Sequence, residues 1–217
     1  MSQIETCFFE RYARASLQTL LGHRYDGLVN KDRPDLQSPD GYTIGIEVTR
    51  AMEQNKDAAE KLLDEVAGVI PREEDASDFN RIISSGYGYG LQGGRYIGSK
   101  ELFYWQLARP LKQILETKIS KAVCGLYGEF DTMGLYIFCK DPMTEAEVFK
   151  TIRYARELQR YAEGGYDLLY LSEVNELHVC NLRDGISDGA RLASYAIPQE
   201  LRTEFYVLSC SPERPQD

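Results

Sequence analysis

The sequence predicts an α/β (α+β) fold, a three-layer sandwich with a mixed central sheet flanked by helices. Amphipathic stretches with helical spacing alternate along the chain with short apolar runs typical of strands. Their order is helix, two or three strands, helices, strand, helix and two strands, which suits a sheet covered by helices. With 217 residues, 43% of them hydrophobic and 27% charged, the chain is long enough for one substantial core.

The domain organisation follows from the absence of internal repeats and linkers. We expect a single domain over residues 1–211 and a flexible polar tail over residues 212–217. No apolar run approaches the roughly 20 residues that span a bilayer, and the first residues lack the apolar core of a signal peptide. These features predict a cytoplasmic protein with no membrane partner. An odd number of widely spaced cysteines indicates reduced core thiols: Cys7, Cys124, Cys139, Cys180 and Cys210.

Residues 4–21 are predicted to form the first helix, which ends at Gly22. Glu10 lies at the edge of the apolar face of this helix, where a carboxylate is costly without a partner. Two interpretations are open for Glu10. It either pairs with Arg14 one turn later or contributes to a polar site.

A hairpin follows a short predicted strand within residues 26–30. Pro39, Asp40 and Gly41 have the residue types of a tight turn. The next strand alternates, with Tyr42, Ile44, Ile46 and Val48 on its apolar face and Thr43, Gly45, Glu47 and Thr49 on the other. A glycine inside such a strand indicates close approach of a ligand or backbone.

Two carboxylates are expected to converge on the outward face of this hairpin. If the turn centres near Asp40, Asp35 lies across from Gly45, and Glu47 is its diagonal neighbour about 7–8 Å away. Oxygen ligands of this kind suit a hard cation such as Mg²⁺.

The middle of the chain is less regular. Residues 59–70 have helical spacing, and residues 71–99 read as an irregular loop. Gly88, Gly90 and Gly93 match G-x-G-x-x-G, but no strand precedes them and no helix follows, so we reject dinucleotide binding. Aromatic and basic residues of this region are candidate substrate contacts: Tyr87, Tyr89, Arg95 and Lys100.

The second half predicts three further strands and three helices. Residues 100–121 are helical, and Pro110 either kinks this helix or begins a second one. A strand over 133–139 precedes a helix with a capping box at Thr144 and Glu147, which ends at Gly164 and Gly165. Strands over 166–171 and 177–182 form a hairpin, and a helix over 199–206 follows.

The net charge of −9 opposes binding to nucleic acid, which usually draws on clustered cations. One basic stripe on the later predicted helix reduces this objection: Lys150, Arg153, Arg156 and Arg160. A solvated helix face balanced by nearby glutamates explains the same stripe.

Taken together, Pro34, Asp35, Glu47 and Val48 resemble the motif of the PD-(D/E)XK nuclease superfamily, which has a restriction-endonuclease-like fold. The resemblance implies that Asp35, Glu47 and the main-chain carbonyl of Val48 hold one or two Mg²⁺ or Mn²⁺ ions. It also implies a metal-site glutamate on the preceding helix, and Glu10 is the residue that matches.

The sequence departs from that family at Thr49, where the motif usually has lysine. A threonine hydroxyl can position water but brings no positive charge to a phosphoryl transition state. In the family, the lysine sometimes comes from a neighbouring element, and Lys31, Lys56 and Lys61 are the candidates here. The sequence does not choose among them.

Two functions follow from the resemblance. The first is a metal-dependent nuclease that hydrolyses phosphodiester bonds of DNA or RNA, potentially as a homodimer. The alternative is a catalytically inactive nuclease-fold protein that serves as a nucleic-acid- or protein-binding accessory module, which the missing lysine and the charge of −9 favour. A lysine ammonium within about 4–6 Å of Asp35 and Glu47 would distinguish them.

Overall fold

The computed structural model describes residues 8–51, 91–92, 95–96, 110–139 and 142–210. The chain divides into two compact units, residues 1–50 with 117–217, and residues 51–116. The larger unit contains the sheet and both candidate carboxylates. In the smaller unit, β4 (Leu91–Gln92) and β5 (Arg95–Tyr96) pair antiparallel, so this part of the expected irregular loop is a small hairpin.

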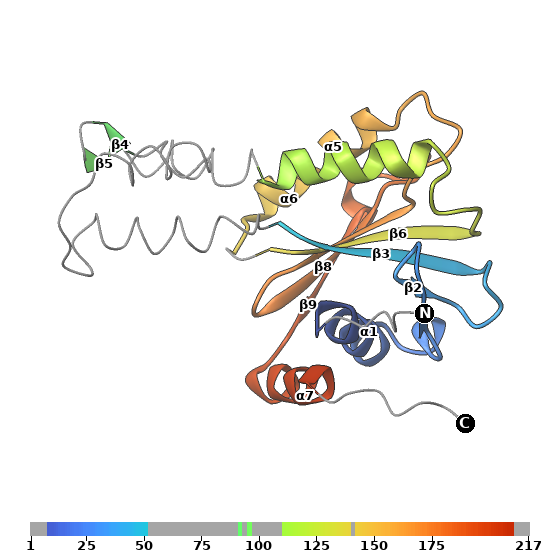
Figure 1. Ribbon diagram of the computed structural model, residues 1–217. Helices are drawn as coiled ribbons and strands as arrows, with labels where there is room; N and C mark the ends of the chain where they lie inside the picture. The colour runs from blue at the N-terminus through green and yellow to red at the C-terminus, as the bar shows by residue number, and fades with distance from the viewer. Residues whose placement is uncertain (1–7, 52–90, 93–94, 97–109, 140–141, 211–217) are drawn as a thin grey trace. The chain divides into compact units, whose positions relative to one another are not determined.

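The larger unit is built on a seven-stranded mixed open sheet in the order β1-β2-β3-β6-β7-β8-β9 (Figure 1). Strands β1, β2 and β3 pair antiparallel, β3, β6 and β7 are parallel, and β8 and β9 return antiparallel. Their bounds are β1 Val29–Asn30, β2 Leu36–Gln37, β3 Ile44–Arg50, β6 Thr132–Phe138, β7 Leu168–Ser172, β8 Glu176–Asn181 and β9 Leu192–Ala196.

Helices cover both faces of this sheet, which confirms the predicted α+β class with a mixed sheet flanked by helices (Figure 1). Helices α1 (Phe8–Leu21) and α7 (Gln199–Cys210) lie on one face. Helix α6 (Glu145–Leu158) and the C-terminal part of α5 (Pro110–Val123) lie on the other. None of the helices in the described ranges has the length and apolar character needed to cross a membrane.

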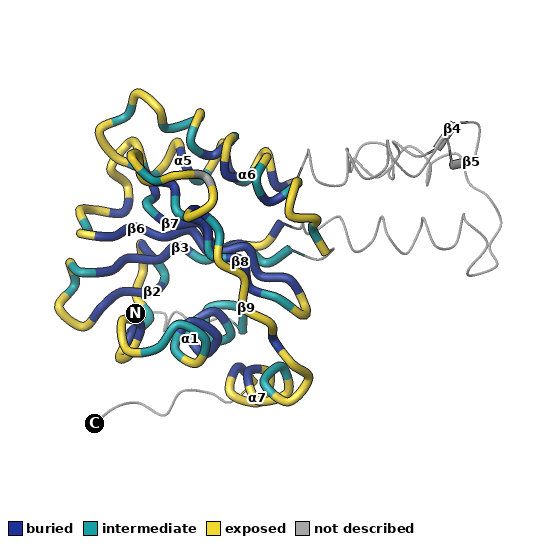
Figure 2. The backbone as a smooth tube through the Cα atoms, turned by 180° about the vertical axis from the view of Figure 1, so that it is seen from behind, coloured by how far each residue is buried: buried dark blue, intermediate teal, exposed yellow. Residues whose placement is uncertain are grey.

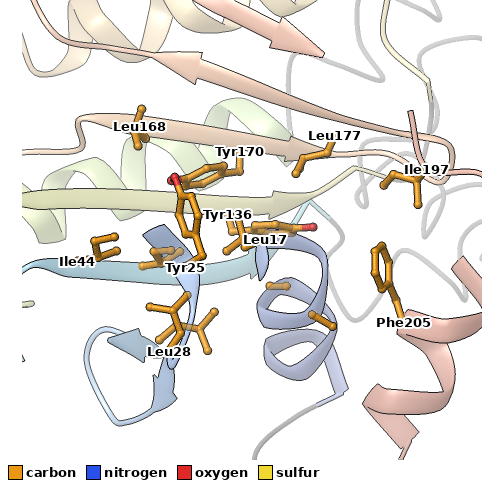
Figure 3. Packing of buried hydrophobic residues seen from close by; sticks show 14 residues of the cluster. Leu17, Tyr25, Leu28, Ile44, Tyr136, Leu168, Tyr170, Leu177, Ile197 and Phe205 are labelled. Carbon is orange, nitrogen blue, oxygen red and sulfur yellow. The ribbon is translucent and has the colours of Figure 1, made fainter. Parts of the chain in front are cut away.

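The main core lies between the sheet and α1 (Figure 3). Ile44 and Ile46 of β3 are almost fully buried there, as their alternation predicts. The core also holds polar hydroxyls in pairs: the Tyr25 and Tyr170 hydroxyls are 2.8 Å apart, and Ser16 Oγ is 2.9 Å from the Tyr136 hydroxyl. Figure 2 shows the buried residues concentrated along the central strands.

Several local predictions are confirmed. Residues 110–121 of the helix predicted over 100–121 are helical and belong to α5, and the residues directly before Pro110 lie outside the described ones. Helix α6 begins with the predicted capping box: the Thr144 side chain accepts from the Glu147 N–H, and the Glu147 carboxylate accepts from the Thr144 N–H. Strands β7 and β8 form the expected hairpin.

Other local predictions are wrong. Tyr42 precedes β3 and is 59% exposed instead of buried. Helix α6 ends at Leu158, well before Gly164, because the Gln159 side chain binds both backbone groups of Tyr166 and holds the following loop. Two of the four described cysteines, Cys124 and Cys210, are exposed, so these are not core thiols. Strand β9 was not predicted, since most of its residues are exposed and show no apolar alternation.

Gly45 in the middle of β3 leaves room for two side chains. A Cβ added at Gly45 would lie 2.7 Å from the Phe130 ring and 2.8 Å from Pro34 Cγ. The expected close approach is therefore made by these packed rings.

Replacing Gly45 with alanine is expected to destabilise the protein by roughly 1–3 kcal/mol, because a buried ring or the backbone must shift. Urea unfolding followed by circular dichroism measures this change. Gly189→Ala is the control, since nothing lies within 4 Å of a Cβ at that exposed position. Equal stabilities of the two variants would contradict the packing explanation.

Candidate metal centre

The hairpin register places Asp35 next to Glu47. Leu36 pairs with Ile46 and Gln37 with Gly45, so continuing the register by one residue pairs Asp35 with Glu47. The predicted register, with Asp35 across from Gly45, is therefore wrong by two residues. The cause is the turn: the Ser38 N–H donates to the Ile44 carbonyl, which closes a loop longer than the sequence suggested.

Asp40 organises that turn and is separate from the carboxylate pair. Its exposed carboxylate accepts hydrogen bonds from the Ser38 hydroxyl, the Tyr42 N–H, and the N–H and hydroxyl of Thr43. The Ser38 and Thr43 hydroxyls, followed by the two backbone N–H groups, hold the pKa of Asp40 well below its usual range. The Asp of Pro39-Asp40-Gly41 thus has a structural role.

Asp35 is fixed by the backbone of β3. The Val48 N–H donates to Asp35 Oδ2 at 2.7 Å. If the β2–β3 pairing is continued along the strands, the residue opposite Val48 is Pro34. Proline has no backbone N–H, so it cannot donate to the Val48 carbonyl. The two backbone polar groups of a strand residue point to the same edge, so we expect the Val48 carbonyl to lie on the Asp35 side of β3.

A lysine ammonium from α5 lies beside the Asp35 and Glu47 carboxylates. Lys118 Nζ donates to Glu47 Oε1 at 2.5 Å. Both side chains are largely buried, with exposed fractions of 19% for Lys118 and 10% for Glu47. Sequence reasoning missed Lys118. The available signal was its position beside Leu115 and Ile119, which places it at the border of the apolar face of the predicted helix.

The environment of Asp35 disfavours its charged form. Burial, and then the negative charge of Glu47, raise the pKa of Asp35 from 3.8 to about 7. The Val48 N–H and the Lys118 ammonium act in the opposite direction, and Glu10 adds to the rise. Lys118 therefore offsets only part of the cost of placing two carboxylates together.

Glu10 lies close enough to influence this pair. Its charge contributes to the raised pKa of Asp35, and its Oε2 accepts from the Asn30 amide at 3.0 Å. The Arg14 guanidinium donates to the other end of the same Asn30 side chain at 3.4 Å. Asn30 of β1 thus links Glu10 and Arg14 between helix and sheet.

The other predicted residues have different positions. Lys31 is exposed, and its ammonium lies 4.0 Å from a Cβ built on Gly41 in the hairpin turn. Thr49 follows Glu47 on the same face of β3 and is half-buried. Arg95 lies in β5 of the smaller unit. The remaining candidates lie outside the described residues: Lys56, Lys61, Tyr87, Tyr89 and Lys100.

The donor set around Asp35 fits a hard divalent cation. Two adjacent carboxylates and a main-chain carbonyl supply only oxygen ligands, which Mg²⁺ and Mn²⁺ prefer. A cation between the carboxylates would also relieve the repulsion that raises the pKa of Asp35. The observation that supports the fit is geometric: the hairpin register places the Asp35 and Glu47 carboxylates side by side on one face.

A second group of potential ligands occurs in the described part of the chain, at the β7–β8 hairpin. Ligand atoms of Glu173, Glu176 and His178 lie within 4.8 Å of one another. Glu173 accepts from the Met143 N–H at 2.7 Å, its Oε1 lies 3.1 Å from His178 Nε2, and His178 Nδ1 is 2.8 Å from Ser194 Oγ. These hydrogen bonds satisfy the buried polar atoms of Glu173 and His178, and they form a network that joins β7, β8 and β9.

Comparisons with protein-family models, with curated proteins and with solved structures found no match for this chain.

Proposed function

We propose that this chain is a divalent-metal-dependent nuclease with a restriction-endonuclease-like core, hydrolysing phosphodiester bonds of DNA or RNA. One observation carries the proposal: the Lys118 ammonium lies 2.5 Å from Glu47, on the sheet face that also bears Asp35. Aspartate, glutamate and lysine are the three residue types of the PD-(D/E)XK motif. In this chain the lysine would come from α5 in place of position 49.

The described order of elements supports the same proposal. In the larger unit, helix α1, the antiparallel strands β1–β3, the C-terminal part of helix α5 and strand β6 follow in this order, with residues 51–116 of the smaller unit between β3 and that part of α5. This is the helix, three strands, helix, strand order of the restriction-endonuclease-like core. Asp35 directly precedes β2 and Glu47 lies in β3, the part of the hairpin where the resembled fold has its metal ligands.

Each residue has a chemical task in this proposal. Asp35, Glu47 and the Val48 carbonyl would hold the metal, which when bound lowers the pKa of a coordinated water and neutralises charge on the phosphate. Lys118 would place a positive charge beside the phosphate, where charge builds up during the reaction. Thr49, on the same strand face, would help to position water through its hydroxyl.

The alternative is a nuclease-fold binding module that does not cleave, which the net charge of −9 favours. The position of Lys118 supports the enzyme, because it brings to the carboxylate pair the positive charge that Thr49 cannot supply.

Titration calorimetry with Mn²⁺ is expected to show binding that strengthens about tenfold between pH 6 and pH 8. The reason is that Asp35, whose pKa is about 7, must lose its proton to bind the cation. The same protein should cleave DNA or RNA oligonucleotides with Mn²⁺ or Mg²⁺, and EDTA should stop the reaction. Binding of Mn²⁺ without cleavage of any strand would reject the enzyme and leave the binding module.

A further inference from the structure

A serine, a histidine and a glutamate are joined by hydrogen bonds across the strands β7, β8 and β9. Ser194 Oγ lies 2.8 Å from His178 Nδ1, and His178 Nε2 lies 3.1 Å from Glu173 Oε1. The candidate metal centre is on β2 and β3, and β6 separates β3 from β7 in the sheet order. We call Ser194, His178 and Glu173 the Ser-His-Glu triad.

Strand register brings the serine to the histidine. Ser194 of β9 pairs directly with His178 of β8. The Asn181 N–H donates to the Arg191 carbonyl, and these two residues are opposite each other in the same register. Hydrogen-bonded and non-hydrogen-bonded pairs alternate along an antiparallel ladder, so His178 and Ser194 form a non-hydrogen-bonded pair. Side chains approach most closely in such pairs, which explains the short contact.

The partners of His178 determine its tautomer. His178 and Glu173 are both more than nine-tenths buried, and Glu173 also accepts from the Met143 N–H at 2.7 Å. A carboxylate only accepts hydrogen bonds, so His178 Nε2 carries the proton that faces Glu173. Nδ1 is then an acceptor, and the Ser194 hydroxyl donates to it. Glu176 Oε2 is 4.0 Å from Nε2, beyond hydrogen-bond distance, so Glu173 is the orienting carboxylate.

This geometry is typical of an activated serine. A nucleophilic serine needs a base within hydrogen-bond reach, and the base needs a third group that orients it. In serine proteases the serine contacts Nε2 and the carboxylate contacts Nδ1. In this protein the two ring nitrogens exchange partners, but one still accepts from the serine and the other still donates to the carboxylate. Ser194 is exposed, so the buried pair presents a nucleophile to solvent.

The backbone of β9 supplies a donor for the oxyanion. In a non-hydrogen-bonded pair the N–H of Ser194 points away from β8. Within the described sheet β9 has a neighbour only on its β8 side, so this N–H faces the free edge. The N–H of the nucleophile itself is one of the two oxyanion donors of serine proteases. Ala196 lies two residues along on the same face, where its small side chain leaves the hydroxyl accessible.

We propose that the Ser-His-Glu triad is a second catalytic centre, which hydrolyses carboxylic esters. Ser194 Oγ bonds to the ester carbonyl carbon, and its proton passes to His178 Nδ1. His178 gives that proton to the leaving alcohol oxygen as the ester C–O bond breaks. Water then attacks the acyl-serine, and one of its protons returns through His178 to Ser194 Oγ as the carboxylic acid leaves. Glu173 holds the imidazole and stabilises its charged form.

This inference does not rest on the proposed nuclease function, because it uses none of the residues of the candidate metal centre and no metal ion. EDTA should stop the nuclease and leave ester hydrolysis unchanged, so the two proposals can fail separately. Ester hydrolysis that EDTA abolishes would overturn the triad and assign Glu173, Glu176 and His178 to a metal site instead.

A fluorophosphonate probe tests the nucleophile directly. The Ser194 Oγ–P bond forms, the P–F bond breaks, fluoride leaves, and the hydroxyl proton passes to His178. With the full chain in EDTA, mass spectrometry should find the adduct on Ser194, and Ser194→Ala should lose it. Ser187→Ala is the matched control, since Ser187 is an exposed serine in the loop between β8 and β9, and it should be labelled like the wild type. An unlabelled wild type, or equal labelling of Ser194→Ala, would overturn the inference.

Hydrolysis of p-nitrophenyl acetate tests the positioning role of Glu173. Glu173→Gln should lower kcat by about 10³–10⁴-fold, because a glutamine amide can donate to His178 Nε2 and leave the proton on Nδ1, where it blocks the serine. KM and the melting temperature should change little, since the glutamine oxygen still accepts from the Met143 N–H. A Glu173→Gln variant that keeps the kcat of the wild type would show that the network only joins the strands.

Discussion

Replacing Lys118 with methionine should reduce nucleic-acid cleavage by about 10²–10³-fold, the usual cost of losing one preorganised charge at such a transition state. Affinity for Mn²⁺ should stay equal or rise, because the ammonium that competes for Glu47 is gone. Single-turnover cleavage and calorimetry measure the two quantities. Lys121→Met is the control, since this lysine is exposed near the end of the same helix.

The same substitution also has a stability cost that must be separated from its catalytic effect. Without Lys118, the Glu47 carboxylate is left buried and uncompensated, which costs roughly 3–5 kcal/mol. Lys118→Met with Glu47→Gln should recover this stability without recovering cleavage. Cleavage is therefore compared at a temperature at which the single variant remains folded.

Returning a lysine to position 49 offers an independent check. Thr49 and Glu47 share a face of β3, so Thr49→Lys places an ammonium on the same side of the sheet as Asp35. Added to Lys118→Met, it should restore part of the lost rate. Full activity of Lys118→Met by itself would show that Lys118 only neutralises Glu47.

Replacing Asp35 with asparagine is expected to weaken Mn²⁺ binding by more than about 100-fold and to abolish cleavage. Loss of a residue that only hydrogen-bonds to a metal ligand already lowers metal affinity by about 10–100-fold, and in this proposal Asp35 is itself a ligand. Asparagine keeps an oxygen for the Val48 N–H, so the hairpin should retain its register. Calorimetry and cleavage assays measure the two losses.

Stability measurements provide a second readout for Asp35→Asn. Because the folded pKa of Asp35, about 7, exceeds its ordinary value of 3.8, folding becomes less favourable as pH rises through this interval. The metal-free variant should therefore be more stable than the wild type at pH 8 and similar to it at pH 4.

Asp40→Asn is the control for metal binding: Asp40 belongs to the turn, so Mn²⁺ affinity should not change. Loss of binding in that variant alone would assign the metal to Asp40.

Local chemistry in the sequence determined much of this protein. Period-two alternation identified the apolar face of β3 that packs against α1, although the opposite face with Gly45 and Glu47 is buried too and not outward as expected. Turn residues located the hairpin, and Thr144 with Glu147 marked the start of α6. Pro34, Asp35 and Glu47 were also found from sequence, because both carboxylates lie on one short hairpin. These features depend on neighbours only a few residues apart.

Long-range packing decided the rest. The register that pairs Asp35 with Glu47 depends on the Ser38–Ile44 hydrogen bond, and hairpin loops of different length fit the same residues. Lys118 lies 71 residues from Glu47 along the chain, and only the packing of α5 against the sheet brings its ammonium to the carboxylate. The Tyr127 and Tyr166 rings lie 6.3 Å apart because β6 and β7 are parallel neighbours, so the loops that precede them share one edge of the sheet.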